Sequence, residues 1–160
     1  MKKILKTTIL TVFLILIMPA ENEAQHPEGL DHEGYYFSKE IMGEFDQIVD
    51  RVIAMFKEEQ FGVVSELNMD ETLNNKLGTQ LKRYKILGMC NPGYAYKAMQ
   101  AEPDIGLMLP CKVLIREMDG ETCVVSAIDP ESTMKTINNP ELDQIAKKVS
   151  EHFKRAMEKL

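Results

Sequence analysis

Cys90 and Cys111 are the side chains of this chain whose type and spacing allow chemistry. Cys90 directly precedes Asn91 and Pro92, a pair typical of a helix start, because Asn caps unpaired amides and Pro suits the first helical position. The amide groups of that helix and the positive end of its dipole would stabilise a Cys90 thiolate, which predicts a lowered pKa. Pro110 favours an extended backbone before Cys111, at the start of a later strand. If the two strand ends are neighbours in the sheet, the two thiols lie together at one sheet edge.

Three interpretations of this cysteine pair remain open. The first is two small buried residues, since unpaired cysteine is among the most buried residue types. The second is a structural disulfide, which an oxidising compartment favours and which would stabilise the fold by roughly 3 kcal/mol. The third is function, in which Cys90 attacks or carries sulfur while Cys111 resolves, or both thiols ligate a soft metal.

Other side chains could extend such a site. Met89 and Met108 lie close in sequence to the cysteines, and thioether and thiolate sulfur suit Cu(I), although methionine is also a common core filler. Lys76, before Gly78, could meet an anion near the predicted helix start, or it is a solvated lysine beside a turn. The sequence names no cofactor. The residues predicted for binding are Lys76, Gly78, Cys90, Asn91, Pro92, Pro110 and Cys111, with Cys90, Cys111, Met89 and Met108 as metal candidates.

The three histidines give a weaker signal. His26 and His32 lie near Glu28 and Asp31 and could hold a divalent ion, or they decorate a mobile N-terminal segment. His152 stands alone on a predicted helix and is expected at the surface or in packing.

Hydrolytic machinery is not recognisable in the sequence. The chain has no G-x-S-x-G, H-E-x-x-H or P-loop motif, and Glu58-Glu59 is expected on an exposed helix face. A formal charge of −6 argues against nucleic acid, because a phosphate backbone is held by many cationic contacts. A binding or accessory role without turnover is therefore favoured over an enzyme.

The first 24 residues have the pattern of a secretory signal peptide. Lys2, Lys3 and Lys6 form a cationic start, and the apolar run Thr7–Met18 is shorter than the about 20 residues that span a bilayer. An uncleaved membrane anchor is the alternative. Cleavage after Ala24 predicts an exported protein of 136 residues, periplasmic in a Gram-negative bacterium and free of the membrane.

The remaining chain is predicted to be a flexible lead-in over residues 25–34 and a single domain over residues 35–160. The expected strands and helices follow from the alternation and the helical periodicity of apolar residues, and their ends from Gly, Pro and Asn residues. Asp70 is predicted to cap a short helix that ends at Gly78. Strands are expected over 35–41, 63–67, 84–89, 109–117 and 122–128, and helices over 43–60, 70–77, 91–100 and 139–160.

The hairpin of the last two strands decides where Cys123 points. With Asp119-Gly120 as a two-residue loop, Arg116 pairs with Cys123, and Cys123 projects from the face opposite to Cys111. A three-residue loop would invert that conclusion. Cys123 is therefore assigned as the cysteine without a partner.

Short linkers between these elements favour an α+β fold of two layers, with helices on one face of a single sheet and a long C-terminal helix. That helix is expected to bury its apolar stripe against the sheet or a partner subunit. The stripe comprises Leu142, Ile145, Val149, Phe153, Met157 and Leu160.

Five ordered sequence blocks resemble the domain-of-unknown-function 302 family, DUF302. The resemblance implies a curved antiparallel sheet of the TATA-box-binding-protein type, in β-α-β4-α order, and a homodimer, and it implies no established activity. The blocks are Phe61–Met69, Lys76–Gly78, Tyr84–Pro92, Pro103–Gly106 with Leu109–Cys111, and Ile128–Pro130.

The prediction for function is an exported, dimeric domain that binds a small ligand or acts as an accessory protein, with its site at Cys90 and Cys111. The alternatives are a thiol redox or sulfur-carrying protein, a binder of copper or haem, and a purely structural envelope protein.

Overall fold

A six-stranded antiparallel sheet, in the strand order β1-β2-β6-β5-β4-β3, forms the centre of the computed structural model, which describes residues 29–160. The predicted signal peptide lies outside the described residues. The elements are β1 (Asp31–Glu33), β2 (Tyr36–Met42), α1 (Phe45–Glu58), β3 (Gly62–Asn68), α2 (Met69–Leu77), β4 (Tyr84–Cys90), α3 (Pro92–Ala101), η1 (Pro103–Met108), β5 (Cys111–Glu117), β6 (Thr122–Ile128), α4 (Pro130–Met134), η2 (Lys135–Ile137) and α5 (Pro140–Glu158).

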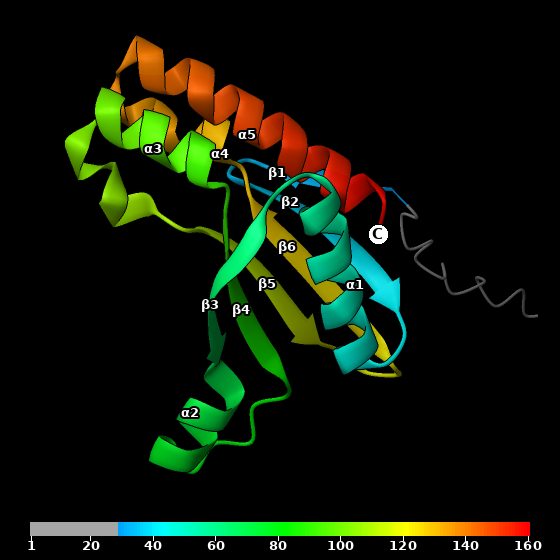
Figure 1. Cartoon of the computed structure of the whole chain (residues 1–160). Helices are drawn as coiled ribbons and strands as arrows, with labels where there is room; N and C mark the ends of the chain where they lie inside the picture. The colour runs from blue at the N-terminus through cyan, green and yellow to red at the C-terminus, as the bar shows by residue number, and fades with distance from the viewer. Residues whose placement is uncertain (1–28) are drawn as a thin grey trace, which may run out of the picture.

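The predicted β-α-β4-α order is confirmed by β2, α1, the four strands β3 to β6, and α5. Helices α1 and α5 cover one face of the sheet, and α3 packs beside α5 (Figure 1). Helix α2 contributes no buried residue and lies at the far end of β3 and β4, away from the other helices (Figure 1). The fold is therefore α+β in two layers, as predicted.

Aromatic side chains join the two helices to the sheet. Phe153 of α5 is fully buried and meets Phe56 of α1 edge to face, with ring centroids 4.9 Å apart. Phe61, which follows α1, meets Phe153 in the same way at 5.2 Å. Val149, Phe153, Met157 and Leu160 of the predicted α5 stripe face this core. Leu142 is buried in a second cluster, and half-buried Ile145 packs against both.

The β5–β6 hairpin has a three-residue loop, so the predicted orientation of Cys123 is wrong. The amide of Met118 donates to the carbonyl of Thr122 at 2.7 Å, and Glu117 pairs with Cys123. Cys123 therefore lies on the core face, the same face as Cys111. The two cysteines still cannot bridge, because Cys111 and the partner position of Cys123 are six residues, about 20 Å, apart along β5.

The predicted lead-in contains a sixth strand. Asp31–Glu33 pairs with β2 as β1, and His32 Nε2 donates to Asp129 Oδ2 at 2.9 Å. Asp129 also accepts from the hydroxyls of Ser132 and Ser150. Burial by itself raises the pKa of Asp129, but these hydrogen bonds outweigh burial and lower it. His32 thus attaches β1 to the core, while His26 and Glu28 lie outside the described residues.

The helix starts follow the predicted capping chemistry in all but one case. Asn91 and Asn139 cap α3 and α5 through their side-chain oxygens, and Gly78 ends α2 with a left-handed backbone, φ 66°. The prediction for Asp70 is wrong, because α2 begins at Met69 after Asn68, which places Asp70 inside the first turn. The Asn68 side chain makes no cap hydrogen bond.

Asn139, which caps α5, and Asn68, which makes no cap hydrogen bond, allow a matched test of capping. Asn139 Oδ1 accepts from the amides of Glu141 and Leu142, and its Nδ2 donates to the carbonyl of Ala101 at 2.8 Å. Asn139→Ala is expected to lower the free energy of unfolding by about 1 to 2 kcal/mol, measured by urea denaturation. Asn68→Ala is the control and should change it by less than about 0.5 kcal/mol. Equal effects of the two substitutions would contradict the capping role.

Candidate functional site

Cys90, at the end of β4, and Cys111, at the start of β5, line one cavity of about 30 Å³. Helices α3, α4 and α5 close it from the other side, and its walls are almost entirely apolar. The lining residues are Phe61, Met89, Cys90, Asn91, Tyr94, Ala95, Ala98, Leu109, Cys111, Pro130, Met134, Ile145, Ala146 and Val149.

The register of the sheet places Cys90 and Cys111 at the neighbouring ends of two paired strands. Met89 pairs with Cys111, so Cys90 is one residue, about 3.3 Å along the strand, past the position opposite Cys111. Gly88 permits the close approach of β4 to the chain before β5. A Cβ at Gly88 would lie 2.5 Å from Pro110 Cγ and closer still to Ser65 Oγ, which leaves no room for a side chain. Because side chains alternate along a strand and Met89 shares the face of Cys111, the Cys90 side chain projects from the other face of the sheet. The two cysteines are neighbours in the backbone, and the convergence of their thiols stays a prediction.

The predicted lowering of the Cys90 pKa is wrong. Burial raises the pKa of the Cys90 thiol, and burial together with the nearby Cys90 raises that of Cys111 to about 12. At the start of α3 the Tyr94 amide donates to Asn91 Oδ1 at 3.1 Å and not to Cys90. Both thiols, like Cys123, are free in the structure.

These pKa directions predict slow thiol chemistry. At pH 7.5 Cys90 and Cys111 should alkylate more slowly than the same cysteines in the urea-unfolded protein, with Cys111 the slower of the two. The rates should rise as the pH increases past 9, because the thiolate is the nucleophile. Alkylation followed site by site with mass spectrometry measures this. Faster reaction of Cys90 in the folded protein than in urea would contradict it.

The structure does not bring all predicted site residues together. Lys76 and Gly78 are exposed at the end of α2, which connects to the start of β4, whereas Asn91 follows its end. Met108 packs against a second core cluster and does not line the cavity. Pro92 is the first residue of α3 and Pro110 directly precedes β5, and neither proline lines the cavity.

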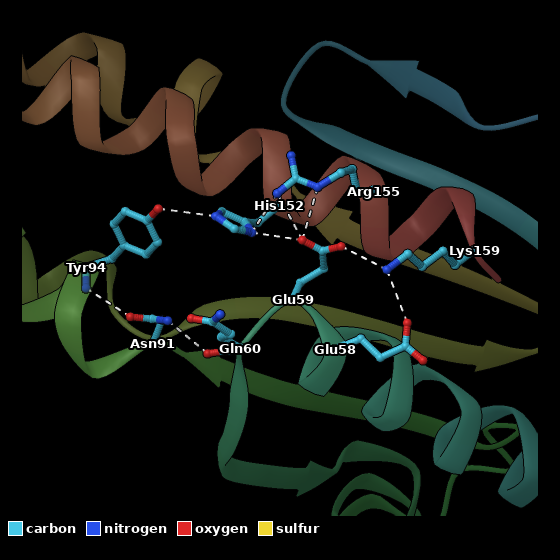
Figure 2. Close-up of polar contacts among 8 residues, drawn as sticks. All are labelled: Glu58, Glu59, Gln60, Asn91, Tyr94, His152, Arg155 and Lys159. Atoms are coloured by element: carbon cyan, nitrogen blue, oxygen red, sulfur yellow. Dashed lines mark hydrogen bonds and ion pairs between the residues drawn. The ribbon is translucent and has the colours of Figure 1, made fainter.

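A polar network that the sequence did not indicate lies beside the cavity, between α1, α3 and α5 (Figure 2). The Tyr94 hydroxyl lies 3.2 Å from His152 Nε2, and His152 Nδ1 lies 2.9 Å from Glu59 Oε2. Arg155 Nη2 lies 2.7 Å from the same Nδ1, so Glu59 and Arg155 both meet this nitrogen of His152. His152 also packs against the rings of Phe61 and Tyr94. Tyr94 thus links the network to the cavity wall.

Glu59 is the centre of this network and is only 9% exposed, contrary to the exposed helix face expected for it. Arg155 donates to Glu59 Oε2 through Nε and Nη2, and Lys159 donates to Glu59 Oε1 at 2.9 Å. Burial by itself raises the pKa of Glu59, but the hydrogen bonds from Lys159, Arg155 and His152 outweigh it and hold the pKa at about 2. Glu59 is therefore ionised at every physiological pH.

The start of α3 is tied to the same region. Asn91 Nδ2 donates to the carbonyl of Gln60 at 2.9 Å, while Asn91 Oδ1 caps the helix (Figure 2). One side chain thereby joins the end of α1 to the helix that covers the cavity. One sequence feature could have pointed to the network. His152 and Arg155 have an i, i+3 spacing, which places both side chains on one face of α5.

The described residues contain no group of three or more His, Cys, Asp or Glu side chains that could hold a metal ion. Among residues 29–160, no helix combines the length and apolar character needed to cross a bilayer. His32 and Asp31, two of the residues considered for a divalent ion, lie in β1, where His32 is engaged by Asp129.

The sheet, its helices and the thiol-lined cavity define an α+β domain of β-α-β4-α order with one small apolar site. The chain belongs to the family described as domain of unknown function DUF302, whose family model matches residues 37–160. The crystal structure of an uncharacterized conserved DUF302 protein from Bacillus stearothermophilus has a TM-score of 0.73 at 23% sequence identity, covering 79% of this chain and 98% of that chain. At that identity the likeness shows the fold. No curated protein matches the chain.

Proposed function

We propose that this DUF302 domain binds a small ligand in the cavity between Cys90 and Cys111 and does not itself turn it over. The observation that supports this is one apolar cavity at the neighbouring strand ends that carry Cys90 and Cys111, both of which are among its lining residues.

The size of the cavity limits the ligand. A volume of about 30 Å³ is well above the roughly 10–15 Å³ that admits one water, and far below the roughly 150 Å³ that holds benzene. Haem, one of the alternatives considered, does not fit the folded site. A nucleophilic or redox role for Cys90 is less favoured than binding, because its thiol is protonated at neutral pH.

Xenon tests the cavity directly, because it is a monatomic apolar probe. Methyl resonances of Met89, Ala95, Ala98 and Met134 should shift in the NMR spectrum of the purified protein under xenon. Ala95→Leu, which fills the cavity from α3, should remove the shifts at the other methyls. Ala101→Leu, on the same helix but outside the cavity lining, is the matched control and should keep them. Unchanged cavity methyls in the wild-type protein would overturn the proposal.

The proposal includes a homodimer. What supports it is the sheet face opposite α1 and α5, where half-buried Tyr84, Leu114 and Ile128 line an open concavity of about 350 Å³. Apolar surface of this kind often marks an interaction site. Light scattering at micromolar concentration should give twice the subunit mass, and Leu114→Glu should give the monomer. A monomer mass for the wild-type protein would contradict the dimer.

Export is the remaining part of the proposal and is supported by the pattern of residues 1–24. N-terminal sequencing of the protein recovered from cells should begin at Gln25. An N-terminus at Met1 in the recovered protein would contradict cleavage.

A further inference from the structure

Helix α2 carries an apolar stripe that its own subunit leaves uncovered. Met69, Leu73 and Leu77 are four residues apart in the sequence and therefore share one face of the helix. Leu77 is 70% exposed, and Met69 and Leu73 pack against neither hydrophobic core cluster. Figure 1 shows α2 at the far end of β3 and β4, clear of the other helices, where a second subunit can reach it.

The shortness of α2 indicates that another surface covers this stripe. An isolated helix is marginal in water below roughly 12 residues, and α2 has nine. Its interior includes Thr72, Asn74 and Asn75, which are weak helix formers. Packing of an apolar face is what stabilises most helices of this kind.

The first turn of α2 adds negative charge beside the stripe. Asp70 and Glu71 lie in that turn, and Asp70 precedes Leu73 by three residues, so it borders the stripe. Arg83, whose pKa Asp70 helps to raise, donates both of its hydrogen bonds to Asp46. The Asp70 carboxylate therefore remains available to a cation outside its own subunit.

The concavity on the sheet face opposite α1 and α5 has the complementary character. Its lining contains two cations, Lys112 and Arg116, and no carboxylate. Because side chains alternate along β5, these cations flank Leu114 on one face of the strand. Both are exposed, and within residues 29–160 no ion pair joins either of them to a carboxylate. An apolar row with a cation at each end thus faces solvent.

We propose that this concavity receives the α2 stripe of a second copy of the chain, and that the two copies exchange the contact reciprocally. The inference rests on the proposed homodimer and names the element that each subunit contributes to it. A two-fold axis makes the same contact twice, which covers both stripes and both concavities in one closed interface. The acidic first turn of α2 lies against the cations of the partner's sheet, and these opposite charges fix the orientation of the two subunits.

Two charge-reversed variants test the exchange by light scattering on the purified protein at micromolar concentration and low salt. The first carries Lys112→Glu with Arg116→Glu, and the second carries Asp70→Lys with Glu71→Lys. Each alone brings like charges together at both contacts and should give the mass of one subunit. Their equimolar mixture should give twice that mass, because each contact of the mixed dimer again joins opposite charges. A mixture that remains monomeric beside a dimeric wild type would overturn the exchange.

The apolar stripe has its own test. Leu77→Glu places a charge in the stripe and should also give the monomer. Leu107→Glu is the matched control, because Leu107 is 89% exposed in η1, outside both surfaces, and it should leave the dimer intact. Circular dichroism checks the fold of each variant.

A wild-type sample requires no substitution. In a dimer assembled from isotope-labelled and unlabelled subunits, nuclear Overhauser effects should connect the methyl groups of Leu73 and Leu77 with those of Leu114 across the interface. A wild-type dimer without these contacts, or one that Leu77→Glu leaves intact, would overturn the exchange and leave the homodimer standing. A wild-type monomer would overturn both, and the xenon test of the cavity is independent of either result.

Discussion

Phe153→Ala is expected to lower the free energy of unfolding by about 3 to 5 kcal/mol, the largest effect of any substitution considered for this protein. Phe153 is fully buried and makes edge-to-face contacts with Phe56 and Phe61, so its removal leaves a cavity between α1, α5 and the sheet. Urea denaturation monitored by circular dichroism gives the change.

Two controls make that result specific. Phe153→Leu keeps most of the buried volume and should recover most of the lost stability. Tyr96→Ala removes an aromatic ring that is 62% exposed on α3 and should change the free energy of unfolding by about 0.5 kcal/mol or less. If Phe153→Ala lowered the free energy of unfolding as little as Tyr96→Ala does, the ring contacts of Phe153 would not be what stabilises the core.

Glu59→Gln is expected to lower the free energy of unfolding at pH 7 by about 1 to 3 kcal/mol. The upper end follows from a pKa of about 2 against the ordinary value of 4.5. The lower end allows for water around the half-exposed Arg155 and Lys159, which screens the ion pairs. Because the folded-state pKa is depressed, this stability is fully present above pH 4.5 and is lost as the pH falls towards 2.

The difference between wild-type protein and Glu59→Gln should therefore shrink to about 0.4 kcal/mol near pH 2, where Glu59 in the folded protein is about half protonated. Urea denaturation from pH 2 to pH 7 measures it. Glu58→Gln is the matched control, because Glu58 is exposed and contacts the same Lys159 without entering the network. A difference that stays constant over this pH range would rule out an ionised Glu59 as the cause.

The proposed site depends on the same network, because His152 positions the Tyr94 hydroxyl and Asn91 fixes the start of α3. Tyr94 and Asn91 both line the cavity. Loss of Glu59 would therefore loosen the wall of the cavity as well as destabilise the fold. The binding tests are best made on variants that leave this network intact.

Local sequence determined most of the elements of this protein. Each of the following signals acts within a few residues and can therefore be recognised in the sequence. They are the amphipathic stripes of α1 and α5, the Asn-Pro starts of α3 and α5, and the glycine at the end of α2. These local signals do not predict the order of the elements in the fold. That order was predicted from the resemblance of five sequence blocks to the DUF302 family.

Three features were decided only by the tertiary structure. Cys123 faces the core because the hairpin loop has one residue more than predicted, and side chains alternate along a strand. Glu59 and His152 are 93 residues apart in the chain, and only the packing of α5 on α1 brings them together. Burial raises the pKa of the Cys90 and Cys111 thiols above the ordinary value, an effect of long-range packing that no neighbouring residue in the sequence reveals. Short-range chemistry determined the elements, and long-range packing determined the environment of the site.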